Sequence, residues 1–198
     1  MNFFKKEKLS DVIIIDNFLS ESYFKILQDM VTSEFFPWSF TREITNTNID
    51  SRLGSYGFQF LLGDYDNFRR CSETDLTMGC LKTIGDCLNA KRVFKARYDM
   101  TLYNSEKFLH KPHIDGDHIP NYFSAILYMN NSDGDTVIYN EKCYKIEEMD
   151  YDMRYTIKKT VTPKENRLVL FEGNVVHTGY SPSNNKNRIL LNAVFDMG

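Results

Sequence analysis

The chain has 198 residues, which is enough for one substantial hydrophobic core, and we expect a single domain over residues 1–198. Its net charge of −3 gives no overall attraction for nucleic acid or anionic membranes. No apolar run approaches the roughly 20 residues that span a bilayer, and residues 1–10 contain no export signal. The four cysteines form no C-x-x-C pair, which indicates reduced thiols. We therefore expect a cytoplasmic protein without nucleic-acid or membrane partners, of undetermined oligomeric state.

The N-terminal part of the chain predicts a short strand and then a helix. Residues 12–15 form a β-branched run that is typical of a strand. Ser20 and Glu21 supply an N-cap and an acidic first turn, and they predict a helix that reaches about Ser33. Its apolar side chains recur three and four positions apart, so one face can pack on a core.

A second helix is predicted after residue 72, where the sequence Ser-Glu-Thr-Asp is typical of a helix start. Four residues repeat every four positions along its expected buried face: Leu76, Cys80, Ile84 and Leu88. Between the two helices, residues 41–57 are rich in Thr, Asn, Ser and Gly, and they predict a long loop or a loosely paired hairpin, with disorder as the alternative. We expect residues 1–90 to supply helical support and a candidate lid.

From residue 91 onward the sequence predicts β structure. Apolar and polar residues alternate over residues 94–102, which indicates a strand with one buried face. Further candidate strands follow at residues 122–128, 136–139, 155–161, 167–171, 175–177 and 188–195. Asp133-Gly134-Asp135 is typical of a hairpin turn between the first two of these, and residues 141–154, dense in Tyr and charge, look inserted between two strands. Helices followed by many short strands favour an antiparallel sandwich or barrel.

Five possible metal ligands lie within residues 110–118. Side chains two positions apart on an extended strand point to the same side, so His113 and Asp115 can reach one ion. His110 is expected to point to the opposite face. A distant His177 would complete a set of two imidazoles and one carboxylate, which suits ferrous iron in oxygenases. The same set also serves zinc in hydrolases, and any single histidine taken by itself is more often solvated.

Arg188 indicates that the site binds more than a metal. Its own face of the predicted strand carries Leu190, Asn192 and Val194, and an arginine there is costly unless a carboxylate or phosphate pairs with it. A bound dicarboxylate, with one end on the metal and the other on Arg188, would meet that need. The alternative is that Arg188 faces solvent or pairs with an acid from elsewhere, such as Glu172.

The order of these residues resembles the 2-oxoglutarate- and Fe(II)-dependent dioxygenases of the prolyl-4-hydroxylase-like group. The most specific part is Pro163-x(4)-Leu168-Val-Leu-Phe171-x(5)-His177-x-Gly179 with Arg188 after it. The insertion at residues 141–154 is unusual for that group, and Asp135 stands where the group usually repeats Gly. The resemblance implies a mainly β fold, in which a double-stranded β-helix (a jelly roll, or cupin-like core) over residues 91–198 carries N-terminal helices packed on one sheet.

The resemblance also implies an oxidoreductase that hydroxylates an unactivated C–H bond while 2-oxoglutarate is decarboxylated to succinate. The implied catalytic and Fe(II)-binding residues are His113, Asp115 and His177. The implied 2-oxoglutarate-binding residues are Arg188, Tyr103 and Asn192. O2 is the second cosubstrate, and ascorbate is a candidate reductant.

The substrate follows less directly, because fold and cofactor do not fix it. The resemblance favours a prolyl residue in a peptide or protein, and a free amino acid or another small metabolite is the alternative. A non-catalytic metal-binding jelly-roll protein and a zinc hydrolase are the competing classes. The candidate contacts at the mouth of the site, which residues 117–122 are expected to border, are Trp38, Arg42, Arg52 and Tyr122.

Overall fold

The computed structural model describes residues 12–45, 55–65, 67–115 and 121–198, and within these ranges it contains two α-helices, one 3-10 helix and eleven strands. In chain order they are β1 (Ile13–Ile15), α1 (Glu21–Thr32), β2 (Ser39–Thr41), β3 (Gly57–Asp64), β4 (Asn67–Phe68), α2 (Ser72–Leu88), β5 (Arg92–Leu102), β6 (Tyr122–Tyr128), β7 (Thr136–Lys142), η2 (Ile146–Glu148), β8 (Ile157–Val161), β9 (Leu168–Glu172), β10 (Val175–Gly179) and β11 (Asn187–Asp196). Both predicted helices and all the predicted strands of the C-terminal half are therefore present.

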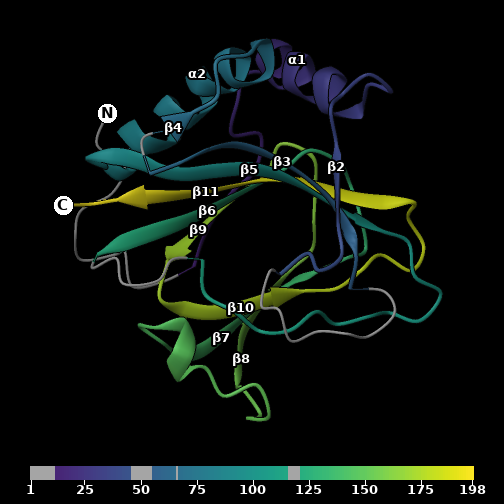
Figure 1. Cartoon of the computed structure of the whole chain (residues 1–198), viewed down its shortest axis with the longest axis vertical. Helices are drawn as coiled ribbons and strands as arrows, with labels where there is room; N and C mark the ends of the chain where they lie inside the picture. Colours follow the sequence, from purple (N-terminus) through teal and green to yellow (C-terminus); the bar gives the residue numbers. More distant parts are fainter. Residues whose placement is uncertain (1–11, 46–54, 66, 116–120) are drawn as a thin grey trace.

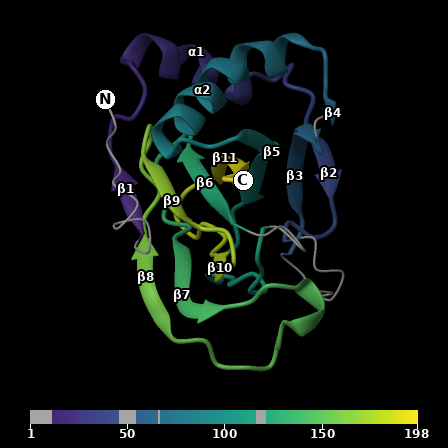
Figure 2. The ribbon, with the colours of Figure 1, turned by 90° about the vertical axis from the view of Figure 1, so that its left-hand side faces the viewer.

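The strands form two antiparallel sheets. The larger has the order β1-β9-β6-β11-β5-β3-β2, with β4 paired to β3, and the smaller has the order β10-β7-β8. Helices α1 and α2 cover the outer face of the larger sheet, and the smaller sheet lies on its other side (Figures 1 and 2). This arrangement is a double-stranded β-helix with helices packed on one sheet, as the resemblance implied.

Alternation along the long central strands separates the two faces of the larger sheet. On β5 and β11, the cross-strand pairs Tyr98–Leu191 and Ala96–Ala193 point toward the helices and are fully buried. They join a core with apolar residues from both helices: Phe24, Leu27 and Val31 from α1, and Cys80, Leu81 and Ile84 from α2. The intervening positions Arg97 and Asn192 carry polar side chains toward the smaller sheet. The largest hydrophobic cluster therefore lies under the helices, and a second one joins the two sheets beside these polar side chains.

The buried face of α2 differs from the predicted one at its first turn. Leu76 is 42% exposed, while Thr77 and Leu81 are buried alongside Cys80 and Ile84. A step of four residues exceeds the 3.6-residue turn by about 40°, so a strict four-residue series drifts off any single face within three steps. The interpretation of Leu76 as a core residue is wrong for this reason.

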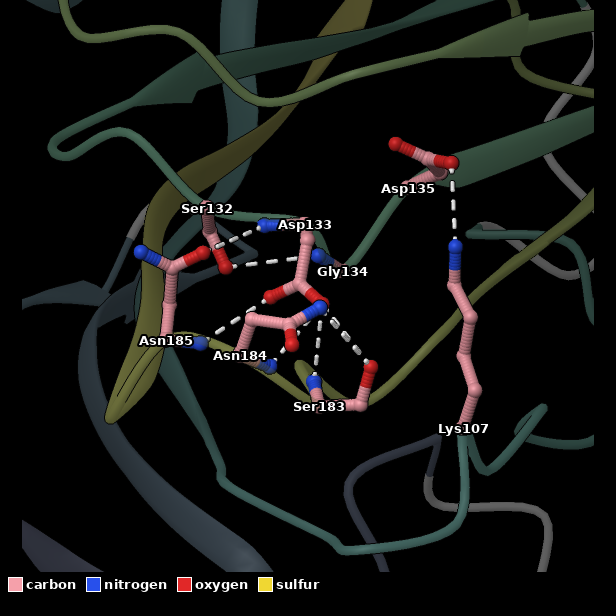
Figure 3. A network of polar contacts seen from close by, with 8 residues as sticks. All are labelled: Lys107, Ser132, Asp133, Gly134, Asp135, Ser183, Asn184 and Asn185. Atoms are coloured by element: carbon pink, nitrogen blue, oxygen red, sulfur yellow. Dashed lines mark hydrogen bonds and ion pairs between the residues drawn. The ribbon is translucent and has the colours of Figure 1, made fainter.

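The segment around Asp133 does not form the predicted hairpin turn. It connects β6 in the larger sheet to β7 in the smaller one. The Asp133 carboxylate accepts hydrogen bonds from the backbone N–H groups of Ser183, Asn184 and Asn185, in the connection between β10 and β11 (Figure 3). The carboxylate thus holds the β6–β7 and β10–β11 connections next to each other. The local sequence of a β-turn cannot reveal a contact with residues so distant in the chain.

Residues 41–57 contain the start of a strand that the sequence did not predict. β2 pairs with β3 from Ser39 opposite Gln59 to Thr41 opposite Gly57, so the hairpin alternative is correct for the described part of this segment. The predicted lid falls mainly on residues 46–54, which lie outside the described residues. The predicted insertion, residues 141–154, is the connection between the paired strands β7 and β8 and contains η2.

The sequence predicted that no segment spans a membrane and that the cysteines are reduced thiols. Among the described residues, neither α-helix has the length and the apolar composition that crossing a membrane requires. All four cysteines are free. Cys80 is buried on α2, and its burial raises the pKa of the thiol to about 12, so this residue behaves as an apolar packing group.

Candidate active site

His113, Asp115 and His177 come together between the two sheets. His113 and Asp115 follow β5, whereas His177 is in the middle of β10, and one possible ligand atom from each lies within 4.8 Å of the other two. The backbones of the two histidines form an isolated antiparallel bridge, with N–H to oxygen distances of 2.9 and 3.0 Å in the two directions. This bridge connects the segment after β5 to the smaller sheet and places the imidazoles next to each other.

Backbone carbonyls orient both imidazoles. The Nδ1 of His113 is 3.3 Å from the carbonyl oxygen of Lys111, and the Nδ1 of His177 is 3.1 Å from that of Val175. Because a carbonyl oxygen only accepts, each Nδ1 donates its proton to that carbonyl, and Nε2 is the ring nitrogen left to face a metal. The two Nε2 atoms lie 4.0 and 3.4 Å from the carboxylate oxygens of Asp115. The donor atoms therefore face a common point.

The donor set fits a divalent metal ion. The Nε2 of His177 and the Oδ2 of Asp115 are buried and make no hydrogen bond, an arrangement that is costly unless another group binds them. Burial lowers the pKa of His113 to about 3, so this imidazole is neutral. Burial by itself raises the pKa of Asp115, but His177 and His113 together hold it well below its usual value. A neutral imidazole and an ionised carboxylate are the forms in which these side chains bind a metal.

Asn192, predicted to bind the cosubstrate, is placed beside Asp115. Its Nδ2 donates to Asp115 Oδ1 over 3.0 Å, which leaves Oδ2 as the carboxylate oxygen without a hydrogen bond. Asn192 lies opposite Arg97 in the β11–β5 register and is buried. In this geometry its amide orients the carboxylate, a role that commonly accompanies metal ligands.

A cavity of roughly 460 Å³, partly open to solvent, connects the two histidines of this triad to Arg188. Its walls come from both sheets, so it lies between them. It is lined from the larger sheet by Arg97, Asp99, Thr101, Ile126, Arg188, Leu190 and Asn192, and from the smaller sheet by Thr136, His177, Thr178 and Gly179. Ile44 and Thr45 close one side.

Arg188 is buried at the far end of this cavity without an acidic partner. It is 8% exposed, and no carboxylate of the described residues lies within 4.0 Å of its guanidinium. Its Nη2 donates to Thr136 Oγ1 over 2.5 Å, and the hydroxyl of Tyr128 donates to the same oxygen over 2.7 Å. Its Nε is buried and makes no hydrogen bond. Glu172, the alternative partner, instead pairs with Lys142.

Gly179 leaves the room that the guanidinium occupies. A Cβ at this position would lie 3.1 Å from Nη1 and 3.2 Å from Nη2 of Arg188, which is closer than nearly all observed contacts of a Cβ. Gly179 is part of the motif on which the resemblance rests. Only the three-dimensional structure shows why this position is a glycine. The absence of a side chain on β10 allows a buried cation on β11 to reach across the cavity.

Tyr103 lies outside the cavity. It follows the last residue of β5 and is 54% exposed. Thr101, two residues earlier, is buried opposite Arg188 and lines the cavity instead. The geometry therefore does not support Tyr103 as a cosubstrate-binding residue. Sequence reasoning missed Tyr128 and Thr136, which lie beside Arg188.

His110 lines the cavity, contrary to the expectation that it points to the opposite face from His113. Its Nε2 lies 3.0 Å from the hydroxyl oxygen of Ser181. Apart from isolated bridges, the segment between β5 and Asp115 is not in a regular strand, so alternation from residue to residue does not apply to it. His113 and Asp115, which are two residues apart, nevertheless point to the same site, as predicted.

The predicted contacts at the mouth have different environments. Trp38 packs on the core under the helices, with its ring 4.7 Å from that of Phe36. Tyr122 is buried in a small cluster with Phe94 and Val194. Neither lines the cavity, so these two predictions are wrong. Arg42 also does not line it, and Arg52 lies outside the described residues.

Arg97 and Asp99 form an ion pair in the cavity wall that the sequence did not single out. Arg97 Nε donates to Asp99 Oδ2 over 2.9 Å, and the two side chains are 12% and 9% exposed. Burial raises the pKa of Asp99, and the nearby Arg97 opposes this shift. Alternation along β5 could have indicated this pair, because both residues share the face that carries Thr101.

Comparison with known proteins identifies the fold. No known family profile matches the sequence, and no curated protein does. A prolyl hydroxylase from Trichoplax adhaerens, solved with a peptide of a hypoxia-inducible factor, matches with a TM-score of 0.66 and 12% identity, over 96% of this chain and 85% of that one. An oxidoreductase of the 2OG-Fe(II) oxygenase family from Burkholderia pseudomallei matches with a TM-score of 0.64 and 10% identity, over 97% and 87% of the two chains.

A third solved structure extends the range of these neighbours. The epimerase SnoN of nogalamycin biosynthesis, in complex with Fe3+, α-ketoglutarate and a nogalamycin compound, matches with a TM-score of 0.59 and 11% identity. The match covers 96% of this chain and 80% of that one. At these identities the likeness establishes the fold, which is the one that 2-oxoglutarate- and Fe(II)-dependent oxygenases share.

Proposed function

We propose that this protein is an Fe(II)- and 2-oxoglutarate-dependent oxygenase that hydroxylates an unactivated C–H bond. The observation that carries the proposal is a cavity lined by two residues of the triad, His113 and His177, at one end and by a buried arginine at the other. Among the described residues, no acid pairs with that arginine. A dicarboxylate that is bound to a metal at its first end supplies the missing negative charge at its second end.

Each residue of the site has a role in this proposal. His113, Asp115 and His177 bind Fe(II), while Asn192 keeps the Asp115 carboxylate in position. Arg188, with Thr136 and Tyr128 beside it, binds the distal carboxylate of 2-oxoglutarate. When bound, iron, 2-oxoglutarate and O2 supply the oxidation of the substrate C–H bond and release succinate and CO2, with ascorbate as a candidate reductant.

The two competing classes explain the cavity less well. A non-catalytic jelly-roll protein predicts that a protein carboxylate neutralises Arg188, and none of the described residues does so. A zinc hydrolase accounts for the triad, but it needs neither a buried arginine nor the glycine that makes space for it. Fe(II) with a dicarboxylate cosubstrate accounts for both ends of the cavity.

For the substrate, we propose a prolyl residue in a peptide or protein, with a free amino acid or another small metabolite as the second candidate. The order of motifs, which resembles prolyl hydroxylases, supports the first. The cavity at the triad, which is bounded on several sides, supports the second. Among solved proteins of this fold, one was solved with a peptide and another with a small natural product.

The proposal is tested by anaerobic titration with Fe(II) and 2-oxoglutarate. Wild-type protein should develop the weak visible charge-transfer band of an iron chelate. Arg188→Met should raise the half-saturating 2-oxoglutarate concentration by about 10- to 100-fold, because a charge-assisted hydrogen bond contributes roughly 1.5–3 kcal/mol. His177→Ala should abolish the band at any cosubstrate concentration tested.

Arg70→Met is the matched control, because Arg70 is exposed and lies outside the cavity. It should titrate like wild type. A wild-type protein that gives no band, or an Arg188→Met variant that titrates normally, would overturn the proposed function. Retention of zinc with hydrolysis in the absence of O2 would favour the hydrolase instead.

A further inference from the structure

A second cavity adjoins the triad on the side away from Arg188. It also measures roughly 460 Å³, is partly open to solvent, and shares Thr45, Arg97, His113 and Asn192 with the first cavity. Its other lining residues are Lys95, Ile114, Asp115, Ile146 and Val194. None of its side chains other than Asn192 and the metal ligands has a role in the proposed binding of iron and 2-oxoglutarate.

The pairing of β5 with β11 shows where this cavity lies relative to the metal ligands. Arg188 is opposite Thr101, Asn192 is opposite Arg97, and Val194 is opposite Lys95. Asn192 contacts Asp115, so the position of Asn192 along β11 shows where the triad lies relative to this strand. Lys95 lies two residues beyond Arg97 on β5, on the side away from Arg188. Two residues span about 7 Å along a strand. A cosubstrate between Arg188 and the triad leaves the Lys95 side open.

The charges in the second cavity are not balanced. Arg97 pairs with Asp99, and Asp115 belongs to the triad. Lys95 is half-buried and makes no ion pair within 4.0 Å, although Asp64 is its partner in the β3–β5 register. Among the described residues of this cavity, Lys95 is therefore the cation without a paired carboxylate. Among the described residues, the side chain of Arg97 has one hydrogen bond, from Nε to Asp99, so its other N–H groups remain able to donate.

Apolar side chains form the rest of the wall. Ile114 lies between the two ligands His113 and Asp115, and Val194 belongs to β11. Ile146 belongs to η2, so the connection at residues 141–154 contributes to this cavity from the smaller sheet. An apolar wall with one cationic group suits a compact organic anion, because the chain of the ligand packs on the isoleucines while the charge reaches the lysine.

We propose that this second cavity is the substrate subsite and that it selects a substrate carrying a carboxylate close to the carbon that reacts. Lys95 binds the carboxylate, and Arg97 supports it. The inference rests on the proposed function, because only a bound metal and cosubstrate give the cavity a reaction to serve. Since Lys95 is about one strand repeat from the level of the triad, carboxylate and reacting carbon belong to the same small molecule or the same residue.

Two sources can supply such a group, and the test separates them. One is a free carboxylic acid, including a free amino acid. The other is the terminal carboxylate of a peptide, which a C-terminal prolyl residue would carry, or an acidic residue. We would fractionate a small-molecule cell extract by ion exchange into anionic, neutral and cationic pools, and assay these beside acidic, neutral and basic peptide libraries. The readouts are succinate formation above the substrate-free rate and one added oxygen by mass spectrometry.

Wild-type protein should respond to an anionic pool or to an acidic library, and the arm that responds identifies the source. Lys95→Met should raise the half-saturating concentration of the active pool at least 10-fold. Lys95→Glu should abolish that response. Both variants should keep the wild-type chelate band and its dependence on 2-oxoglutarate, which a general structural defect would not allow. Lys82→Glu, the same charge change on the exposed face of α2, should respond like wild type.

The inference fails if only neutral or cationic pools stimulate the wild-type protein, if no anionic pool or acidic library does, or if Lys95→Glu responds normally. The proposed function fails separately, because the chelate band needs no substrate. A wild-type protein without that band overturns both. A wild-type band with an unaltered response in the Lys95 variants overturns only the inference about the substrate.

Discussion

The burial of Arg188 depends on small details of its neighbours. The guanidinium lies between the Thr136 hydroxyl and the space over Gly179, and its carbon is 5.7 Å from the centre of the Tyr128 ring. A buried arginine needs paired hydrogen bonds to an anion, and Thr136 satisfies only one of its donors. The site is therefore preorganised for a ligand but not neutralised without one.

Gly179→Ala should weaken cosubstrate binding without affecting the metal. The new Cβ would press on the guanidinium of Arg188, which must move by a few tenths of an ångström from the cavity position described. We expect the half-saturating 2-oxoglutarate concentration in the chelate titration to rise about 3- to 10-fold, corresponding to roughly 1 kcal/mol.

Gly85→Ala is the control for this substitution, because a Cβ there makes only an ordinary contact of 3.4 Å with Phe195. It should leave the titration unchanged. Equal titrations for Gly179→Ala and wild type would show that Arg188 adapts freely, and that Gly179 has no part in positioning it.

At the scale of elements, the site depends on how the connections cross between the sheets. Thr136 is the first residue of β7 and directly follows the β6–β7 connection. Arg188 is the second residue of β11, just after the β10–β11 connection. The Asp133 carboxylate joins these connections by accepting from three backbone N–H groups and from the side chains of Ser183 and Asn184 (Figure 3). Nearby, Lys107 pairs with Asp135 over 3.4 Å, at the more exposed side of the same connection.

Asp133→Asn should destabilise the fold in a pH-dependent way. These hydrogen bonds outweigh burial and lower the pKa of Asp133 from 3.8 to about 2. Because the pKa in the folded state is the lower one, the stabilisation is fully present above about pH 4 and is lost as the pH falls from 4 to 2. Allowing for partial exposure, we expect a loss of about 1–2 kcal/mol at pH 7 and a smaller loss at pH 3, measured by urea unfolding.

The control for Asp133 is Asp29→Asn, on the exposed surface of α1, where the side chain is 61% exposed and pairs with Lys25. Its cost should stay within about 0.5 kcal/mol, as for exposed i,i+4 pairs. An Asp133→Asn variant whose stability difference from wild type is the same at pH 7 and pH 3 would contradict the assignment of that carboxylate as the charged acceptor.

At the scale of the whole molecule, the two sheets meet at the site. The larger sheet carries Arg188 and Asn192, the smaller carries His177 and Thr136, and the segment after β5 supplies the other two ligands. A ligand bound there contacts both sheets and a segment with little regular structure of its own. Binding should therefore stabilise the folded state as a whole.

Anaerobic Fe(II) together with 2-oxoglutarate should raise the midpoint of thermal unfolding. At about 100 times the dissociation constant, linkage gives roughly 2.7 kcal/mol, which corresponds to about 5–10 °C for a chain of this size. His177→Ala should lose most of this shift, whereas Arg188→Met should lose only the increment from 2-oxoglutarate. Differential scanning fluorimetry under argon measures both, and equal shifts in all three proteins would contradict specific binding at this site.

Much of the fold followed from the sequence. The strand and helix periods predicted the elements from α1 to β11 because alternation and 3.6-residue spacing are local consequences of backbone geometry. Leu76, the connection at Asp133 and the strands β2, β3 and β4 were the exceptions. For Leu76, the connection and β3, the deciding partner is distant: the core under α2, residues 183–185, and β5.

For the candidate site, the sequence by itself determined the identity and order of His113, Asp115, His177 and Arg188, because ligand chemistry and a charge on an apolar strand face can be recognised in the sequence. Only the tertiary structure decided that Tyr103 does not line the cavity, and that Tyr128 and Thr136 accompany Arg188. It also placed Lys95 beyond the triad. Those assignments depend on strand register and on an irregular segment after β5, neither of which local periodicity specifies.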